Sequence, residues 1–234
     1  VLTTVTMLRL AASFSDSTAF FDIPMLQMLL TETAIGWAAI ARITALLAVV
    51  TLALTSAKRF YPILFAIIAV VLLSWNGHGA MTDNALGWLH LAGNALHLLA
   101  GLGWIGALAA FLWAATLSKE SSHDLAVSLE RFAGVGTAFV ALLLATGIAN
   151  TLFIVGSNAL PTLLETTYGR LLITKIVLFA AMLAAAAANR FWLTPRMIAS
   201  PSLAAVRTSL GAELLLGIAV LAIVAWLGTL DPSL

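Results

Sequence analysis

Two histidines on one predicted helix are the groups of this sequence best suited to bind a metal ion. His90 and His97 are seven residues apart, nearly two helical turns, so both imidazoles lie on one face of a helix. They are separated by about 10.5 Å along the axis, because each residue rises about 1.5 Å. One ion cannot bind both on a straight helix, so each imidazole needs a partner from another segment. Neutral imidazole is a common ligand of late transition metals.

Methionines and a third histidine extend this donor set. His78 precedes Met81 by three residues, and Met25 and Met28 have the same spacing directly after a proline. Thioether sulfur adds a preference for Cu(I). All four residues fall in segments that we assign to the outer side, which predicts a site for a soft cation there. Ordinary packing is the alternative for the Met25 and Met28 pair, and an interfacial histidine without a ligand role is the alternative for His78 and His90.

A polar stripe runs along the helix that carries the two histidines. Asn94, Gly101 and Trp104 continue the face of His90 and His97. A polar stripe on an apolar helix faces protein or water rather than lipid, and an ionisable group inside a span is costly enough to favour a functional role for His97. We expect this stripe to form the path of the ion, with Asn94 next to His97 and Trp104 further along the helix.

Two charged side chains fall inside predicted spans. Arg42 is about nine residues from the outer end of its span, and Glu213 is about six from the inner end of the last span. A lone charge at the bilayer centre costs about 2.5–3.5 kcal/mol on an insertion scale, so an ion pair between them is one solution. Interhelical hydrogen bonding is the favoured interpretation of both, together with Lys175, Asn150 and Asn189. Gating or proton coupling through Glu213 is the alternative.

The composition restricts the chain to the membrane. Of its 234 residues, 62% are hydrophobic and 9% are charged, whereas roughly a quarter are charged in a soluble domain. A soluble fold is excluded because it needs more polar surface. The chain has 11 Lys and Arg against 10 Asp and Glu, which excludes a nucleic-acid-binding surface. The absence of cysteine excludes disulfides and thiolate metal sites.

Long apolar runs predict an all-α polytopic transmembrane helical bundle, with the lipid bilayer around it. Each crossing takes about 20 apolar residues. Six runs qualify, near 34–56, 60–76, 87–116, 130–156, 170–191 and 207–229. Residues 1–21 are a candidate for a further N-terminal span and lack the basic start of a signal peptide. We therefore divide the chain into an N-terminal segment, 1–33, and a transmembrane domain, 34–234.

The distribution of positive charge predicts the orientation. Basic side chains gather in alternate loops, which the positive-inside rule places in the cytoplasm. They are Lys58, Arg59, Lys119, Arg131, Arg190, Arg196 and Arg207. The segments 15–33, 77–86 and 157–169 and the C-terminus are then on the outer side.

Short motifs are spaced along residues 30–234. The first group consists of WNGHGA at 75–80, NALH at 94–97 and WIG at 104–106. The second group begins with TTYGRLLITK at 166–175 and continues with NR at 189–190, Pro195, Glu213 and LGTLDP at 227–232. Thr33, Gly36 and Arg42 precede both groups. Together these motifs resemble the CopD/PcoD family of bacterial inner-membrane copper-resistance and copper-uptake proteins.

The resemblance implies copper handling across the bacterial inner membrane, and the outer side on which the charge distribution places the C-terminus is then the periplasm. It assigns the copper role to His78 and His97, whereas His90 lies outside the family pattern and is a candidate from the residues alone. Asn94 stands where the family usually has Asp, so an amide would have to support His97 there. Ala107 stands where the family usually has a second Gly, and members usually begin with one or two further helices.

Three functions fit these features. The first is copper transport or delivery, in which His78 captures a copper ion with Met81, or with Met25 and Met28, and passes it to His97. A periplasmic copper-binding protein would be its partner, and no covalent product forms, so the chain is not expected to be an enzyme. The second is a b-type haem electron carrier, which needs two histidines at similar depth on facing helices. The third is a scaffold for metalloenzyme assembly.

Overall fold

All regular secondary structure in the part of the chain that the structure describes is helical. The structure is a computed structural model, and it describes residues 23–55, 58–76, 85–117, 122–155, 163–199 and 203–230. The chain divides into two compact units, residues 1–99 and residues 100–234. The predicted division at residue 33 stays a prediction.

Five helices within these ranges are long and apolar enough to cross a membrane. They are α3 (Ala34–Leu54), α5 (Ala85–Leu117), α6 (Ser122–Val155), α7 (Thr167–Ala188) with its continuation to Arg196, and α9 (Ala204–Leu227). The shortest of the five, α3, has 21 residues and a length of about 31 Å, which matches the hydrocarbon core of about 30 Å. The predicted all-α class is confirmed, with five helices of spanning length.

Two of the predicted spans, at 60–76 and at 1–21, are not among these five helices. The run at 60–76 forms a shorter helix, α4 (Phe60–Leu72), followed by a 3-10 turn, η1 (Leu73–Asn76). A sixth span there stays a prediction. The candidate N-terminal span at 1–21 lies outside the described residues.

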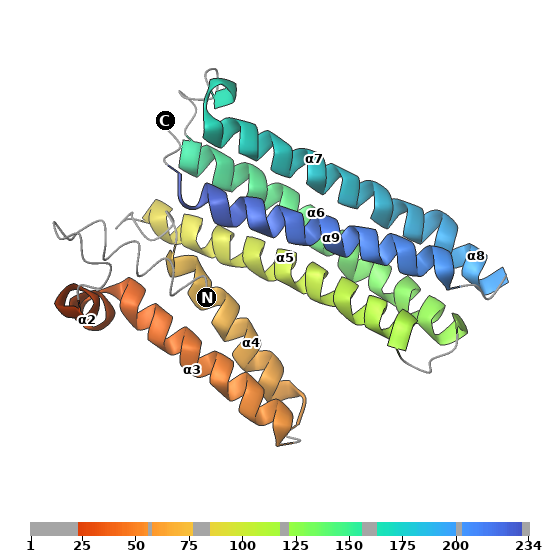
Figure 1. Cartoon of the computed structure of the whole chain (residues 1–234), viewed down its shortest axis with the longest axis horizontal. Coiled ribbons are helices and arrows are strands. Elements are labelled where there is room, and N and C mark those ends of the chain that lie inside the picture. Colours follow the sequence, from red (N-terminus) through yellow and green to blue (C-terminus); the bar gives the residue numbers. More distant parts are fainter. Residues whose placement is uncertain are drawn as a thin grey trace. The chain divides into compact units, whose positions relative to one another are not determined.

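The unit of residues 1–99 contains a pair of helices, α3 and α4, that lie side by side (Figure 1). A further helix, α2 (Ile23–Glu32), precedes them and packs on α3. The sequence predicts a loop at 15–33, but α2 occupies the second half of it. The segment IPMLQMLLTE has leucine, methionine and glutamine, which favour helix, and its proline lies in the first turn, where proline is tolerated.

A threonine followed three residues later by a glycine starts α3. The Thr33 hydroxyl accepts a hydrogen bond from the Gly36 N–H at 3.0 Å and donates one to the Leu29 carbonyl oxygen at 2.6 Å. A Cβ atom at Gly36 would collide with that carbonyl oxygen. This motif therefore caps α3 and permits a junction with α2 that is too close for any larger residue.

The same arrangement starts α7 in the other unit. The Thr166 hydroxyl accepts a hydrogen bond from the Gly169 N–H at 3.0 Å and donates one to the Leu163 carbonyl oxygen at 2.8 Å. Leu163 begins a 3-10 turn, η3 (Leu163–Glu165). A Cβ atom at Gly169 would collide with the same Leu163 oxygen. Two of the spaced motifs thus have a capping role in the structure.

The unit of residues 100–234 is built from the second half of α5 together with α6, α7 and α9. Figure 1 shows α7 alongside α9, and their contacts agree with this. Trp104 of α5 packs edge-on against Phe179 of α7, with ring centroids 6.0 Å apart. Gly217 lets α9 approach α5, because a Cβ atom there would lie 3.2 Å from Ile105. Small residues at such contacts are typical of membrane helices.

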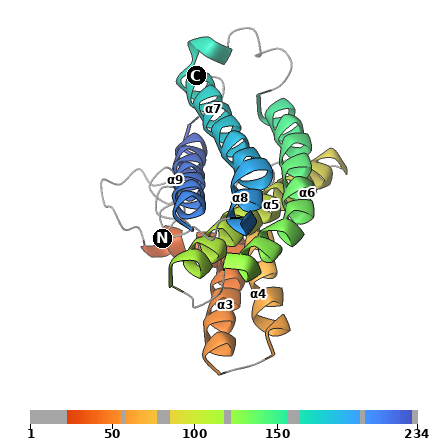
Figure 2. The same ribbon diagram turned by 90° about the vertical axis from the view of Figure 1, so that its right-hand side faces the viewer.

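The long helix that begins with α7 changes its hydrogen-bonding pattern before Pro195. A π-helical turn, η4 (Asn189–Leu193), separates α7 from α8 (Thr194–Ala199), and Figure 2 shows α8 continuing α7. The Thr194 N–H bonds to the Asn189 carbonyl oxygen, five residues back. Pro195 has no N–H, and its ring crowds the preceding turn, which accounts for the extra residue in the turn. The π turn sets the directions of Asn189 and Arg190.

Candidate functional site

One face of α5 is buried and carries both histidines. His90 is 7% exposed, and Asn94 and His97 are half-buried. On other faces of the same helix, Leu89 is 62% exposed and Leu96 is 46% exposed. The imidazoles therefore lie on the side of α5 that is turned toward protein, and the apolar leucines lie on the side available to lipid.

The structure describes little of the predicted outer ligands. His78 and Met81 lie outside the described residues. Met25 belongs to α2, but its side chain is outside the described part, whereas Met28 of the same helix is 43% exposed. Across the residues that are described, no three His, Asp or Glu side chains come together in a way that could hold a metal ion. The ligand set stays a prediction.

Trp104 has a packing role in the structure. It is 4% exposed and belongs to the hydrophobic core of the unit of residues 100–234, where its ring contacts Phe179. An ion path along the stripe from His97 stays a prediction.

Glu213 is buried and bonded to a side chain that follows α7 in the sequence. It is 1% exposed, and its Oε1 accepts a hydrogen bond from the Nδ2 of Asn189, which is 8% exposed. This is an interhelical hydrogen bond of the kind expected from the sequence. Arg42 is half-buried in α3, which belongs to the other unit, so its pairing with Glu213 stays a prediction.

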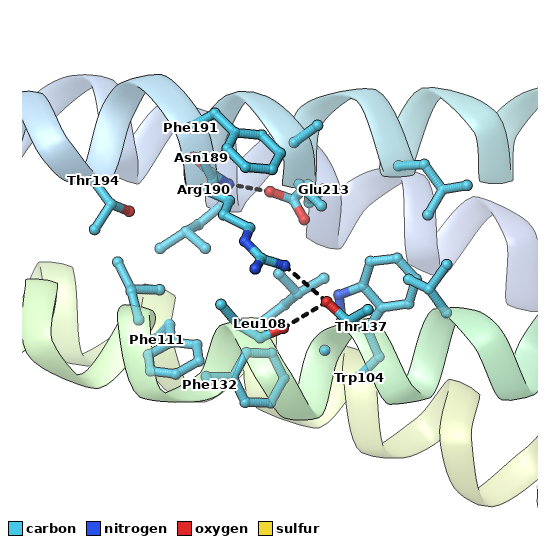
Figure 3. A pocket seen from close by; sticks show the side chains of 18 residues that line it. Trp104, Leu108, Phe111, Phe132, Thr137, Asn189, Arg190, Phe191, Thr194 and Glu213 are labelled. Carbon is cyan, nitrogen blue, oxygen red and sulfur yellow. Dashed lines mark hydrogen bonds between the residues drawn. The ribbon is translucent and has the colours of Figure 1, made fainter.

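A cavity of about 220 Å³ lies beside this pair. Apolar side chains of α5, α6, α7 and α9 form most of its lining, and Figure 3 shows the polar ones together. The polar lining residues are Thr137, Asn189, Arg190, Thr194 and Glu213. Arg190 extends to α6, where its Nη1 donates a hydrogen bond to the Thr137 hydroxyl at 2.8 Å (Figure 3).

One polar atom of this cluster has no partner. The Asn189 Oδ1 is buried and accepts no hydrogen bond from the described part of the protein. Most buried polar atoms in proteins are hydrogen-bonded to protein or to ordered water. Asn189 lines the cavity, but its Oδ1 is fully buried, so this acceptor lies beside the cavity without facing it.

A further contact joins α9 to α5 in the same unit. The Arg207 Nε donates a hydrogen bond to the carbonyl oxygen of Ala115, in the last turn of α5. The C-terminal end of a helix attracts positive charge. Arg207 is thus a structural contact as well as one of the basic residues that predict orientation.

The sequence did not predict the contact between Asn189 and Glu213 or the contact between Arg190 and Thr137. Sequence reasoning named Asn189 and Glu213 separately, and it included Arg190 in a motif, but it did not pair either of them with a partner. The spacing offers no signal for the pairing, because a π turn changes the side-chain directions by one residue. Thr137 is an ordinary threonine of α6 that also bonds to the carbonyl oxygen four residues back, so nothing in the sequence distinguished it.

Two protein-family models match the sequence. The family described as copper resistance protein D matches residues 126–227. The family described as copper resistance protein D-like, N-terminal domain, matches residues 1–88.

Two known proteins are similar to the chain over most of its length. Copper resistance protein D of Pseudomonas syringae pv. tomato is 34% identical over an alignment of 251 positions, which covers 100% of this chain and 81% of that protein. Inner membrane protein YebZ of Escherichia coli (strain K12) is 34% identical over 195 residues, which cover 80% of this chain and 66% of that protein. No solved structure matches the chain.

Proposed function

The chain belongs to the copper resistance protein D family, and on that premise we propose that it transports or delivers copper ions across the bacterial inner membrane. The name of one relative refers to copper resistance, and that of the other refers to the inner membrane. Five helices of spanning length fit a multi-pass protein of this kind. Copper is the cargo in this proposal, and no covalent chemistry is performed on it.

The observation that carries the proposal is the buried histidine face of α5. His90 is buried and His97 is half-buried, on a helix whose other faces are apolar and exposed. Polar and ionisable side chains inside spans are rare and mark ion pathways. Imidazole nitrogen binds copper well. Two imidazoles two turns apart provide two successive positions for one ion rather than a single chelate.

Capture at the outer side completes the path. His78 and Met81 lie between η1 and α5, and Met25 and Met28 lie in α2. A mixed set of imidazole and thioether ligands favours Cu(I). In this proposal His78 takes the ion first, with Met81 or with the α2 pair, and His97 receives it within the bundle.

Topology is the second part of the proposal. The positive-inside rule places the ends of helices near Arg59, Arg131, Arg190 and Arg207 in the cytoplasm, and the capture segments and the C-terminus in the periplasm. The partner is then a periplasmic copper-binding protein. The α4 helix and η1 together have 17 residues, the lower limit for a span, so a sixth crossing fits this topology.

Copper accumulation by cells that produce the protein tests the proposal. We expect His97→Ala to reduce the copper that accumulates to the level of cells without the protein. His123→Ala is the matched control, because His123 is exposed at the start of α6 and should leave accumulation unchanged. Equal accumulation with wild type and His97→Ala would reject the proposal. A Soret band in the purified protein would favour the haem carrier instead.

A further inference from the structure

Glu213 is a carboxyl group inside an apolar bundle whose described partner is neutral. It is 1% exposed, and the amide of Asn189 donates its hydrogen bond. Arg190 lines the same cavity, but its guanidinium bonds to Thr137. Burying an ionised carboxylate without a counter-ion costs much more free energy than burying a neutral group. A proton on the carboxyl removes that cost and supplies a hydrogen-bond donor.

The unsatisfied acceptor of Asn189 is an independent observation at the same place. This side chain is more than nine-tenths buried, lines the cavity and has no partner for its Oδ1 among the described residues. Water satisfies such an acceptor where the space is polar and exceeds about 10–15 Å³. The cavity of about 220 Å³ exceeds this requirement many times. Asn189 and Glu213 both line this cavity, so water that enters it lies next to both side chains, although the Oδ1 itself is fully buried.

The π turn presents these groups to the cavity. Asn189 is the first residue of the turn and Arg190 is the second, and the turn directs one side chain to α9 and the other to α6 (Figure 3). Single π turns within α-helices occur frequently at functional sites. Apolar residues would pack equally well at this turn, so the two adjacent polar residues, Asn189 and Arg190, are not explained by helix packing alone.

We propose that Glu213 is a proton-binding site, reached by water in the cavity of the unit of residues 100–234, with Asn189 as a positioning residue. A carboxylate oxygen takes a proton from a hydronium ion in the cavity and leaves a water molecule, and the reverse step returns it. No other bond forms or breaks. The side-chain oxygens of Glu213 and Asn189 are poor ligands for Cu(I). The proton bound here is therefore distinct from the copper ion that the protein is proposed to transport. The inference does not rest on the copper ligands.

The charged groups around Glu213 are few in the described part of this unit. From the π turn after α7, Arg190 lines the cavity. From α6, Glu130 is exposed and lines a neighbouring pocket together with Arg190. Arg207 is on the same helix as Glu213 and bonds to Ala115 of α5. The α5 residues that line the cavity are Trp104, Leu108 and Phe111, which are not ionisable at ordinary pH.

Infrared spectra of the purified full-length chain in H₂O and in D₂O at neutral pH test the proton site. Exposed carboxyl groups are ionised at neutral pH, so the C=O stretch of a protonated carboxyl reports a buried one. We expect this band, with a shift in D₂O, in the wild type and in Glu130→Gln, and we expect Glu213→Gln to lack it. Absence of the band from the wild type, or its persistence in Glu213→Gln, would overturn the proposal. Asn189→Leu should keep the band but move it, because the carboxyl loses a hydrogen bond.

Thiol labelling tests the water in the cavity without changing Glu213. The chain has no cysteine, so single cysteines can be introduced directly. Val140 lines the cavity, whereas Ala138 is exposed on the same helix, outside the lining and two residues nearer its N-terminal end. We expect a water-soluble maleimide to modify Val140→Cys at least about tenfold faster than Ala138→Cys, because maleimide labelling needs water around the thiolate. Equal rates, or an unreactive Val140→Cys, would overturn the proposal.

Discussion

The side-chain amide of Asn189 donates a hydrogen bond to the carboxyl group of Glu213, and both side chains are more than nine-tenths buried. The two residues are 24 positions apart in the sequence and belong to the π turn after α7 and to α9. This contact joins two membrane helices through polar groups in an apolar interior. Mutations can separate the contribution of this hydrogen bond to the free energy of unfolding from its proposed role in proton binding.

Replacing the amide with an apolar group of similar size should destabilise the protein. We expect Asn189→Leu to lower the free energy of unfolding by about 1–3 kcal/mol, because a buried carboxyl group loses its hydrogen bond. Unfolding of the purified protein in increasing concentrations of sodium dodecyl sulfate, followed by circular dichroism, measures this change. Thr174→Ala is the control, since Thr174 is exposed on α7 and bonds within its own helix to the Arg170 carbonyl oxygen. Equal stability of Asn189→Leu and the wild type would contradict the prediction.

The hydrogen bond between Arg190 and Thr137 should couple α6 to the π turn. We expect a double-mutant cycle of Thr137→Val and Arg190→Leu to give a coupling free energy of about 0.5–1.5 kcal/mol. The same denaturation assay applied to both single variants and to the double variant provides the cycle. Strictly additive effects would mean that the 2.8 Å contact contributes nothing to stability.

The glycine after the cap of α7 should not tolerate a side chain. We expect Gly169→Ala to destabilise the protein by about 1–3 kcal/mol or more, because the added Cβ would meet the Leu163 carbonyl oxygen. Gly211→Ala is the matched control within α9, where a Cβ would have nothing within 4 Å. It should be neutral or stabilising by up to about 1 kcal/mol, since alanine favours helix over glycine. Equal thermal stability of Gly169→Ala and Gly211→Ala would contradict the prediction.

A carboxylate at position 94 should strengthen copper binding. Asn94 is half-buried on the histidine face of α5, three residues before His97. We expect Asn94→Asp to increase copper affinity by about tenfold or more, because a carboxylate that bonds to a ligating imidazole makes it a better donor. Competition with a Cu(I) chelator measures the affinity, and Asn150→Asp on α6 controls for added charge. Unchanged or weaker affinity in Asn94→Asp alone would contradict the prediction.

Much of the fold could be predicted from apolar runs, because the length of a span is set by the membrane. The helix ends could not, since helices continue into water where the pattern becomes amphipathic. α6 begins at Ser122 rather than near 130, because Leu125 and Ala126 are buried while Asp124 and Ser128 of the same turns are exposed. The long helix of α7 likewise continues through the π turn to Ala199.

The candidate site was predictable as a set of residue types but not as a set of contacts. The histidine face of α5 follows from a spacing of seven residues, which helical geometry alone converts into one face. The pair of Asn189 and Glu213 depends on a π turn before Pro195 and on the packing of α7 against α9, which no local pattern encodes. The contact of the Trp104 ring with Phe179 could not be predicted either, and the ion path along its stripe stays a prediction.

The central claim is that imidazole groups of this chain bind copper inside the membrane. Metal analysis combined with an absorption spectrum, on protein purified from copper-supplemented cells, tests it most directly. We predict stoichiometric copper and no Soret band in the wild type and in His123→Ala, and loss of the bound copper in His97→Ala. A wild-type protein without copper, a haem spectrum, or copper retained in full by His97→Ala would contradict the account.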